Sequence, residues 1–143
     1  LPVSSLHVAP AADPTRETYL NQGEIITSIR LPAVEDTFFS SYRKVRTRRS
    51  WDFALAGVAL ALELDGPMVR SAKVYFSGCA PIPWRSVEVE ASISGRKLES
   101  KIINQAAERA VARAKPLSQN QYKVALLQGV LKEELFKAAD RSS

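Results

Sequence analysis

The sequence predicts an α+β fold, with an antiparallel sheet of three to four strands followed by three helices packed on one face. Segments before residue 80 alternate apolar and polar side chains, as strands do, and segments after residue 99 repeat apolar residues at helical spacing. No strand–helix–strand alternation occurs, so a parallel sheet is not expected. With 143 residues, 45% of them apolar, the chain can bury one hydrophobic core.

The first expected strand covers residues 24–31, where apolar and polar side chains alternate, and Pro32 would end it. Ile26 is an exception because it falls on the face that is otherwise polar, beside Ser28 and Arg30. Such a residue is either a tolerated surface side chain or a contact to a partner domain or a planar ligand.

The second expected strand covers residues 37–47, which are rich in aromatic and hydroxyl side chains, with a bulge between Tyr42 and Val45. The third covers residues 53–64, which are apolar almost throughout and therefore expected to be buried on both faces. Its alanines leave a helix as an alternative.

The dipeptide Asp65-Gly66 favours the strand because it is typical of a two-residue hairpin turn with positive φ at both positions. Residues 68–78 alternate and would form the returning strand. Three helices are expected after this hairpin, over residues 84–94, 99–115 and 121–138. The first of these is open, because its β-branched residues also suit a strand.

Residues 1–22 are expected to form an extended lead-in, since they contain three prolines and show no regular patterning. Position 1 is leucine and Met68 is the only methionine, so the chain is interpreted as the tail of a longer protein. Residues 23–143 would then be its C-terminal domain.

The residue types that carry most chemistry are scarce. The single cysteine, Cys79, excludes an internal disulfide, and together with the single histidine, His7, it leaves too few ligands for a zinc site. No glycine-rich phosphate loop and no catalytic set are present. The longest apolar run, residues 53–62, is about half of a membrane-spanning helix. The domain is therefore expected to have no catalytic centre of its own and no membrane contact.

Positive charge is concentrated in one place. The formal net charge is +5, and residues 43–49 contain five basic side chains and no acidic one. This pattern indicates either an anionic partner, such as a nucleic acid stacking on Tyr42 and Trp51, or one solvated strand face. Composition alone does not decide between them.

Five stretches also occur in the order of one family's motifs. They are G-E-I-I with L-P (residues 23–32), Y-R-K-V (42–45), R-S-W-D-F-A (49–54), G-C-A-P-I-P-W-R (78–85) and G-R-K (95–97). Together they resemble the C-terminal domain of the FAD-binding (medium) subunit of the molybdenum hydroxylases. That family includes xanthine dehydrogenase, aldehyde oxidoreductases and carbon monoxide dehydrogenase. One departure is Lys123, where relatives often carry arginine, so a helix–sheet contact there is open.

The resemblance implies an oxidoreductase whose FAD is held mainly by an N-terminal domain of the same subunit, with the C-terminal domain closing over the flavin. By motif alignment, Ile26 matches a residue in contact with the flavin and Lys44 matches a lysine at the same cofactor. An aliphatic side chain can pack on the ring, and an ammonium group can stabilise negative charge on reduced flavin. The fragment alone is expected to be inactive.

The resemblance also implies two partner subunits, one with iron–sulfur clusters and one with the molybdenum cofactor, and a cytoplasmic location with the bacterial periplasm as the alternative. Two other functions remain open at this point. One is a basic nucleic-acid-binding α+β module, and the other is a docking domain whose cofactor contacts are incidental.

Overall fold

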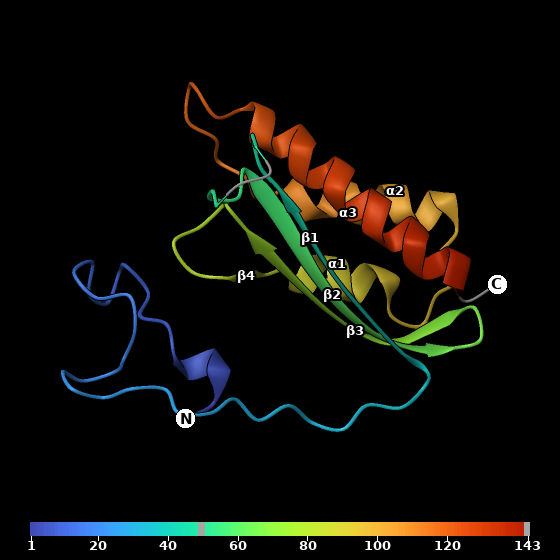
Figure 1. Ribbon diagram of the computed structural model, residues 1–143. Coiled ribbons are helices and arrows are strands. Elements are labelled where there is room, and N and C mark those ends of the chain that lie inside the picture. Colours follow the sequence, from blue (N-terminus) through green and yellow to red (C-terminus); the bar gives the residue numbers. More distant parts are fainter. Residues whose placement is uncertain (49–50, 142–143) are drawn as a thin grey trace.

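A computed structural model describes residues 1–48 and 51–141. Within them, one antiparallel sheet in the strand order β1-β2-β3-β4 is followed by three α-helices (Figure 1). The elements are a 3-10 turn η1 (Val3–Ser5), strands β1 (Phe38–Val45), β2 (Ala56–Asp65), β3 (Met68–Ser77) and β4 (Trp84–Arg85), and helices α1 (Val87–Ile93), α2 (Ser100–Val111) and α3 (Tyr122–Arg141). The α+β prediction is confirmed.

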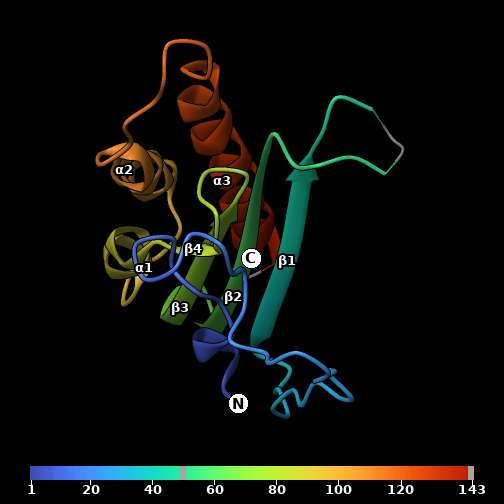
Figure 2. The ribbon, with the colours of Figure 1, turned by 90° about the vertical axis from the view of Figure 1, so that its left-hand side faces the viewer.

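All three helices lie on one side of the sheet (Figure 2). Helix α3 packs on β1 and β2, α1 packs on β3, and α2 rests on the other two helices. The core forms where alternate side chains of β2, such as Leu60 and Leu62, meet Leu131 and Leu135 of α3, all at most 2% exposed. Burying each such side chain contributes about 1.5–3 kcal/mol, so this interface supplies much of the domain's stability.

Strand β2 is buried more completely on one face than on the other. Val58, Leu60 and Leu62 are buried against the helices, whereas Ala59 and Ala61 on the other face are only half-buried. The expectation of burial on both faces is therefore wrong for this strand, and the helix alternative is wrong as well. The small side chains on the second face leave the centre of the sheet open.

The expected strand over residues 24–31 is wrong within this chain. Residues 24–35 belong to no helix or strand, and Ile25, Ile29 and Leu31 are 80%, 72% and 80% exposed. Alternation shows that one side of a segment is suited to burial, but it does not say which sheet would supply the hydrogen-bonding edge. The fourth strand is instead β4, only two residues long and too short for a pattern.

The β2–β3 hairpin turns one residue later than expected. Asp65 pairs with Met68, so the turn residues are Gly66 and Pro67. Only the glycine has a positive φ, of 55°. This agrees with proline, whose ring fixes a negative φ at the second position. The β1–β2 register is continuous, without the bulge expected between Tyr42 and Val45, and the irregularity lies between Glu63 and Leu64 of β2.

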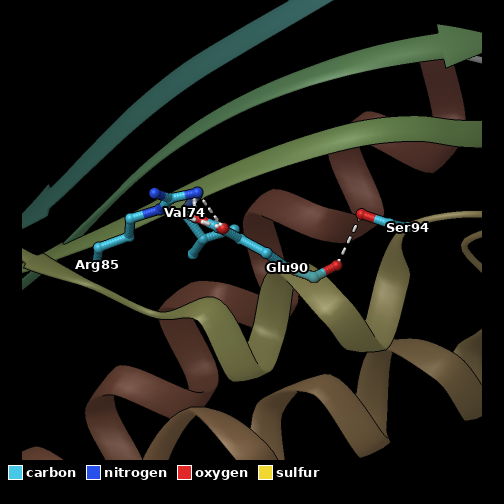
Figure 3. Close-up of polar contacts among 4 residues, drawn as sticks. All are labelled: Val74, Arg85, Glu90 and Ser94. Atoms are coloured by element: carbon cyan, nitrogen blue, oxygen red, sulfur yellow. Dashed lines mark hydrogen bonds and ion pairs between the residues drawn. The ribbon is translucent and has the colours of Figure 1, made fainter.

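The two longer helices confirm the sequence prediction, and α1 is shorter than expected because its first residues form β4. Glu90 of α1 joins these elements, as Figure 3 shows. Its Oε1 accepts hydrogen bonds from the Val74 N–H at 3.0 Å and from Arg85 Nε at 2.9 Å, and Arg85 Nη2 donates to Oε2 at 2.8 Å. The carboxylate thereby satisfies a backbone donor of β3 where β4 is too short to do so.

The lead-in folds on itself. Val8 and Tyr19 donate backbone hydrogen bonds to Glu17 and Leu6, and a turn at Glu35–Phe38 then begins the domain. Figure 1 shows this segment running below the sheet towards the start of β1. None of the helices in the described residues is long and apolar enough to cross a membrane.

Candidate functional site

The sheet face opposite the helices has a row of residues suited to ligand contact. Lys44 of β1 lies opposite Gly57 of β2, which in turn lies opposite Ser77 of β3. In the adjacent row on the same face, Ala59 separates two tyrosines, Tyr42 and Tyr75. Larger side chains on β1 and β3 therefore flank β2, whose side chains on this face are very small.

A groove of about 610 Å³ lies at the Lys44 end of this face. It is lined by Tyr42, Lys44, Phe53, Ala54 and the stretch from Ser77 to Pro81. Phe53 is 92% exposed and Tyr42 is 63% exposed, so two aromatic side chains reach into solvent beside one ammonium group. Such exposed aromatics in a hollow are typical of a surface that meets a ligand or another domain.

Two glycines allow the backbone of the groove to pack closely. Gly78 has a φ of 76°, and a Cβ at this position would lie 2.7 Å from Ala54 O. A Cβ on Gly57 would lie 2.4 Å from Ser77 Oγ. A side chain at either position would push apart the strands or the loop that form the groove.

Lys44 differs electrostatically from its basic neighbours. Arg43 Nε lies 3.5 Å from a Glu133 carboxylate oxygen, and Arg48 Nε lies 3.6 Å from Asp52. Lys44 is exposed and has no ion-pair partner among residues 1–48 and 51–141. Acidic side chains thus neutralise part of the local positive charge, whereas Lys44 lines the groove without an acidic partner among the described residues. Arg49 lies outside the described residues.

Two further polar groups lie in the groove wall. Ser77, whose Oγ is buried over Gly57, lines the groove, and that oxygen has no hydrogen-bond partner in the described part of the chain. Partial burial raises the pKa of the Cys79 thiol, an effect that hydrogen bonding and the Lys123 charge only partly offset. The thiol is therefore neutral at physiological pH and unsuited to act as a nucleophile.

The groove is held from behind by α3. Lys123 Nζ donates a hydrogen bond of 2.8 Å to Gly78 O. The helix–sheet contact left open by the sequence is therefore present with lysine. A second, apolar cavity of about 370 Å³ lies between this turn, Trp84, and the facing ends of α2 and α3.

Ile26 lies apart from this groove. It is 54% exposed in the extended segment before β1, whereas Lys44 is the seventh of eight residues of β1. Ile26 is not among the residues that line the groove, so the groove of this chain contains only one of the two expected cofactor residues.

Sequence reasoning singled out Lys44, which lines the groove, but not Phe53 and Ser77, which also line it, nor Gly57 beside it. The available signal was the alternation of large and small residues in Ala56–Leu62, which places Gly57, Ala59 and Ala61 on one face. No group of three or more potential metal ligands occurs among the described residues. His7 pairs through its backbone with Thr18 in the lead-in.

Together these features define an α+β domain with one sheet face packed by helices and an open groove at one end of the other face. Residues 40–139 match the family described as the CO dehydrogenase flavoprotein C-terminal domain. The chain belongs to this family.

Its relatives are longer proteins. It is 36% identical over 101 residues to the glyceraldehyde dehydrogenase medium chain of Sulfolobus acidocaldarius, covering 71% of this chain and 35% of that protein. It is 39% identical over 85 residues to the FAD-binding subunit of an Escherichia coli aldehyde oxidoreductase, covering 59% of this chain and 25% of that protein. The chain thus spans well under half of either relative.

The fold also matches a solved carbon monoxide dehydrogenase from Hydrogenophaga pseudoflava that lacks the Mo-pyranopterin moiety of its molybdenum cofactor. The TM-score is 0.76 at 26% identity, and the match covers 87% of this chain and 44% of that one. Neither the family nor these relatives support the nucleic-acid alternative.

Proposed function

We propose that this chain is the C-terminal domain of the FAD-binding subunit of a molybdenum hydroxylase, and that it helps to enclose a flavin that passes electrons from iron–sulfur clusters to an acceptor. The single observation that carries the proposal is the Lys44 groove, in which an exposed lysine lies beside the small residues Ala54, Gly78 and Ala80. The family and the named activities of the relatives support the same assignment.

The residues of the groove fit a flavin. The ring is planar, and Gly78 and Ala80 in the groove, with Gly57 beside it on the same sheet face, leave room for a flat ligand. Ser77 Oγ, buried without a partner in the described residues, would become a hydrogen-bonding group for the polar edge of such a ring if its side chain turned towards the groove. When bound, FAD supplies the electron-transfer chemistry, and the protein supplies position and charge.

Lys44 would tune the cofactor through its charge. An ammonium group near the ring favours the state with more negative charge, and so favours reduction. Lys44 is exposed in this chain, and a second domain that covered the site would exclude water and strengthen the effect of the charge. The chain alone would then be inactive.

The proposal extends to the whole complex. An N-terminal domain of the same subunit would hold most of the FAD, and residues 1–22 would lead from it into the domain of residues 23–143. Separate subunits would carry the iron–sulfur clusters and the molybdenum cofactor, in the cytoplasm. Ile26 would also contact the flavin, provided that the extended segment before β1 lies against the N-terminal domain.

The test is Lys44→Gln in the full-length subunit, with Lys73→Gln as the matched control. Lys73 is an exposed lysine on the same sheet face, and it does not line the groove. Losing about 1–2 kcal/mol of charge interaction corresponds to a fall of roughly 20–45 mV for a two-electron couple. We expect Lys44→Gln to lower the flavin potential by this amount or to weaken FAD retention, and Lys73→Gln to do neither. Unchanged potential and flavin content in Lys44→Gln would contradict the proposal.

A further inference from the structure

The segment of residues 24–31 has two unusual features. Its apolar side chains are exposed, and its residues 25–31 make no backbone hydrogen bond with any described residue. The apolar side chains Ile25, Ile29 and Leu31 are 72% to 80% exposed, and their odd-numbered positions would place them on one side of a strand. Single exposed apolar residues are ordinary, but three in register on one side form a stripe typical of a surface that another element covers.

The backbone of the segment also lacks partners within the described chain. Residues 25–34 make no backbone hydrogen bond with any described residue, although their chain is extended. Backbone donors and acceptors in an extended, apolar segment are normally satisfied by a neighbouring strand. Both the stripe and the backbone therefore point to pairing with a sheet.

The sheet of this domain does not supply that edge. The outer edge of β1 is open, but the segment leaves the start of β1 and runs below the sheet rather than along the strand (Figure 1). The turn at Glu35–Phe38 separates it from β1, and the family match begins only at residue 40. The segment thus lies outside the compact α+β unit.

A longer relative contains more chain that could hold the segment. The match to the Hydrogenophaga protein covers 87% of this chain. Residues 37–143 alone make up a smaller share of the chain than this. Part of the segment before residue 37 therefore follows a similar path in that protein. This chain covers only 44% of that protein. The path of the lead-in therefore recurs in a longer protein, more than half of which lies outside the matched region.

We propose that residues 24–31 form an edge β-strand of the sheet in the preceding, FAD-binding part of the subunit, with Ile25, Ile29 and Leu31 in the core of that part. The inference rests on the proposed function in assuming that such a part precedes this domain. The boundary between the domains then moves from residues 22–23, where the sequence motifs placed it, to residues 32–37. Ile26 projects from the opposite face of the strand, which would let it face the flavin while its neighbours are buried.

Hydrogen exchange in the full-length subunit tests the strand. We expect amides of residues 25–31 to exchange at least about 100-fold more slowly in the full-length subunit than in the 143-residue chain. Exchange at the unprotected rate in the full-length subunit would overturn the proposal. Slow exchange already present in the 143-residue chain would also overturn it, since β1 would then be the partner edge.

A pair of variants tests the direction of the side chains. Ile29→Gln in the full-length subunit should reduce the protection of residues 25–31 by about tenfold or more, while Arg30→Gln on the opposite face should leave it unchanged. Equal effects of the two variants would contradict the assigned faces. FAD content is measured on the same samples. Protection without FAD would contradict the proposed function and leave the strand intact, whereas FAD without protection would contradict the strand alone.

Discussion

Lys123 Nζ donates a hydrogen bond of 2.8 Å to Gly78 O, joining the first turn of α3 to the turn after β3 across 45 positions of sequence. The turn that carries this carbonyl contributes Gly78, Cys79 and Ala80 to the groove beside Lys44. Helix α3 therefore positions the groove wall as well as filling the core.

Replacing Lys123 should loosen this connection. Lys123→Met keeps the aliphatic stem but leaves Gly78 O without its donor, so we expect a loss of about 1 kcal/mol in unfolding free energy. Lys123→Arg keeps a cationic donor and should retain most of the stability. Urea unfolding of the three proteins measures the difference. Equal stability of the methionine variant and the parent would show that the hydrogen bond contributes nothing.

Gly78 should be the glycine least tolerant of substitution in the groove. Its φ of 76° disfavours any side chain, and a Cβ would lie 2.7 Å from Ala54 O and 3.0 Å from Leu55 O. We expect Gly78→Ala to destabilise the domain by about 2–4 kcal/mol through strain and crowding. Thermal or urea unfolding measures this loss.

Gly129→Ala is the matched control. Gly129 lies in α3 and is exposed, and a methyl group added there would meet no described atom within 4 Å outside its own helical surroundings. Alanine there should stabilise the helix by about 0.5–1 kcal/mol, because it reduces the backbone freedom of the unfolded chain. Replacing glycine by alanine should thus lower the unfolding free energy at Gly78 and raise it at Gly129. A mild effect at Gly78 would mean that the groove backbone can relax.

Sequence patterns predicted the parts of the fold that are determined by the local alternation or helical spacing of apolar residues. The alternation in residues 68–78 and the apolar stripe of residues 121–138 correspond to β3 and α3 with small errors at the ends. In both cases the core that buries the apolar face is supplied by the same domain. Local periodicity therefore sufficed.

The sequence predictions failed where the structure depends on another segment or on strand pairing. Residues 24–31 alternate like a strand, but this domain offers them no paired edge. Strand β4 has two residues, so only its pairing with Tyr75 and Phe76 defines it. The groove depends on the register that sets Lys44, Gly57 and Ser77 in one row, and register is not visible in a single strand.

Cys79 provides a probe of the groove. Because burial raises the pKa of its thiol, little thiolate is present at neutral pH, and we expect slow alkylation that accelerates as the pH rises towards and above 9. In the full-length subunit, bound FAD should slow the reaction further, since Cys79 lines the groove. Mass spectrometry of FAD-loaded and FAD-depleted samples measures the rates. Identical rates would place the flavin away from this wall.

Glu90 should make stability depend on pH. Burial raises the pKa of its carboxyl, but hydrogen bonds from Arg85 and the Val74 N–H, with the charges of Arg85 and Lys73, lower it overall. A carboxyl whose pKa is lower in the folded state stabilises the fold above its unfolded pKa, near 4.5, and loses this contribution as the pH falls through the folded value. Wild-type stability should therefore fall on acidification below about pH 4.5.

Glu90→Gln isolates this contribution. Glutamine can still accept from the Val74 N–H but loses the charge-assisted bonds to Arg85, so we expect a loss of about 1–2 kcal/mol at pH 7. The gap between the stabilities of variant and parent should narrow below pH 4.5, because the unfolded parent then binds a proton that the folded carboxylate, with its lowered pKa, accepts only at more acidic pH. Glu108→Gln, on the exposed side of α2, should change stability by less than about 0.5 kcal/mol at either pH. Urea unfolding at pH 7 and pH 3.5 measures all three proteins. A gap for Glu90→Gln that stays constant between the two pH values would mean that its charge does not stabilise the joint of β3, β4 and α1.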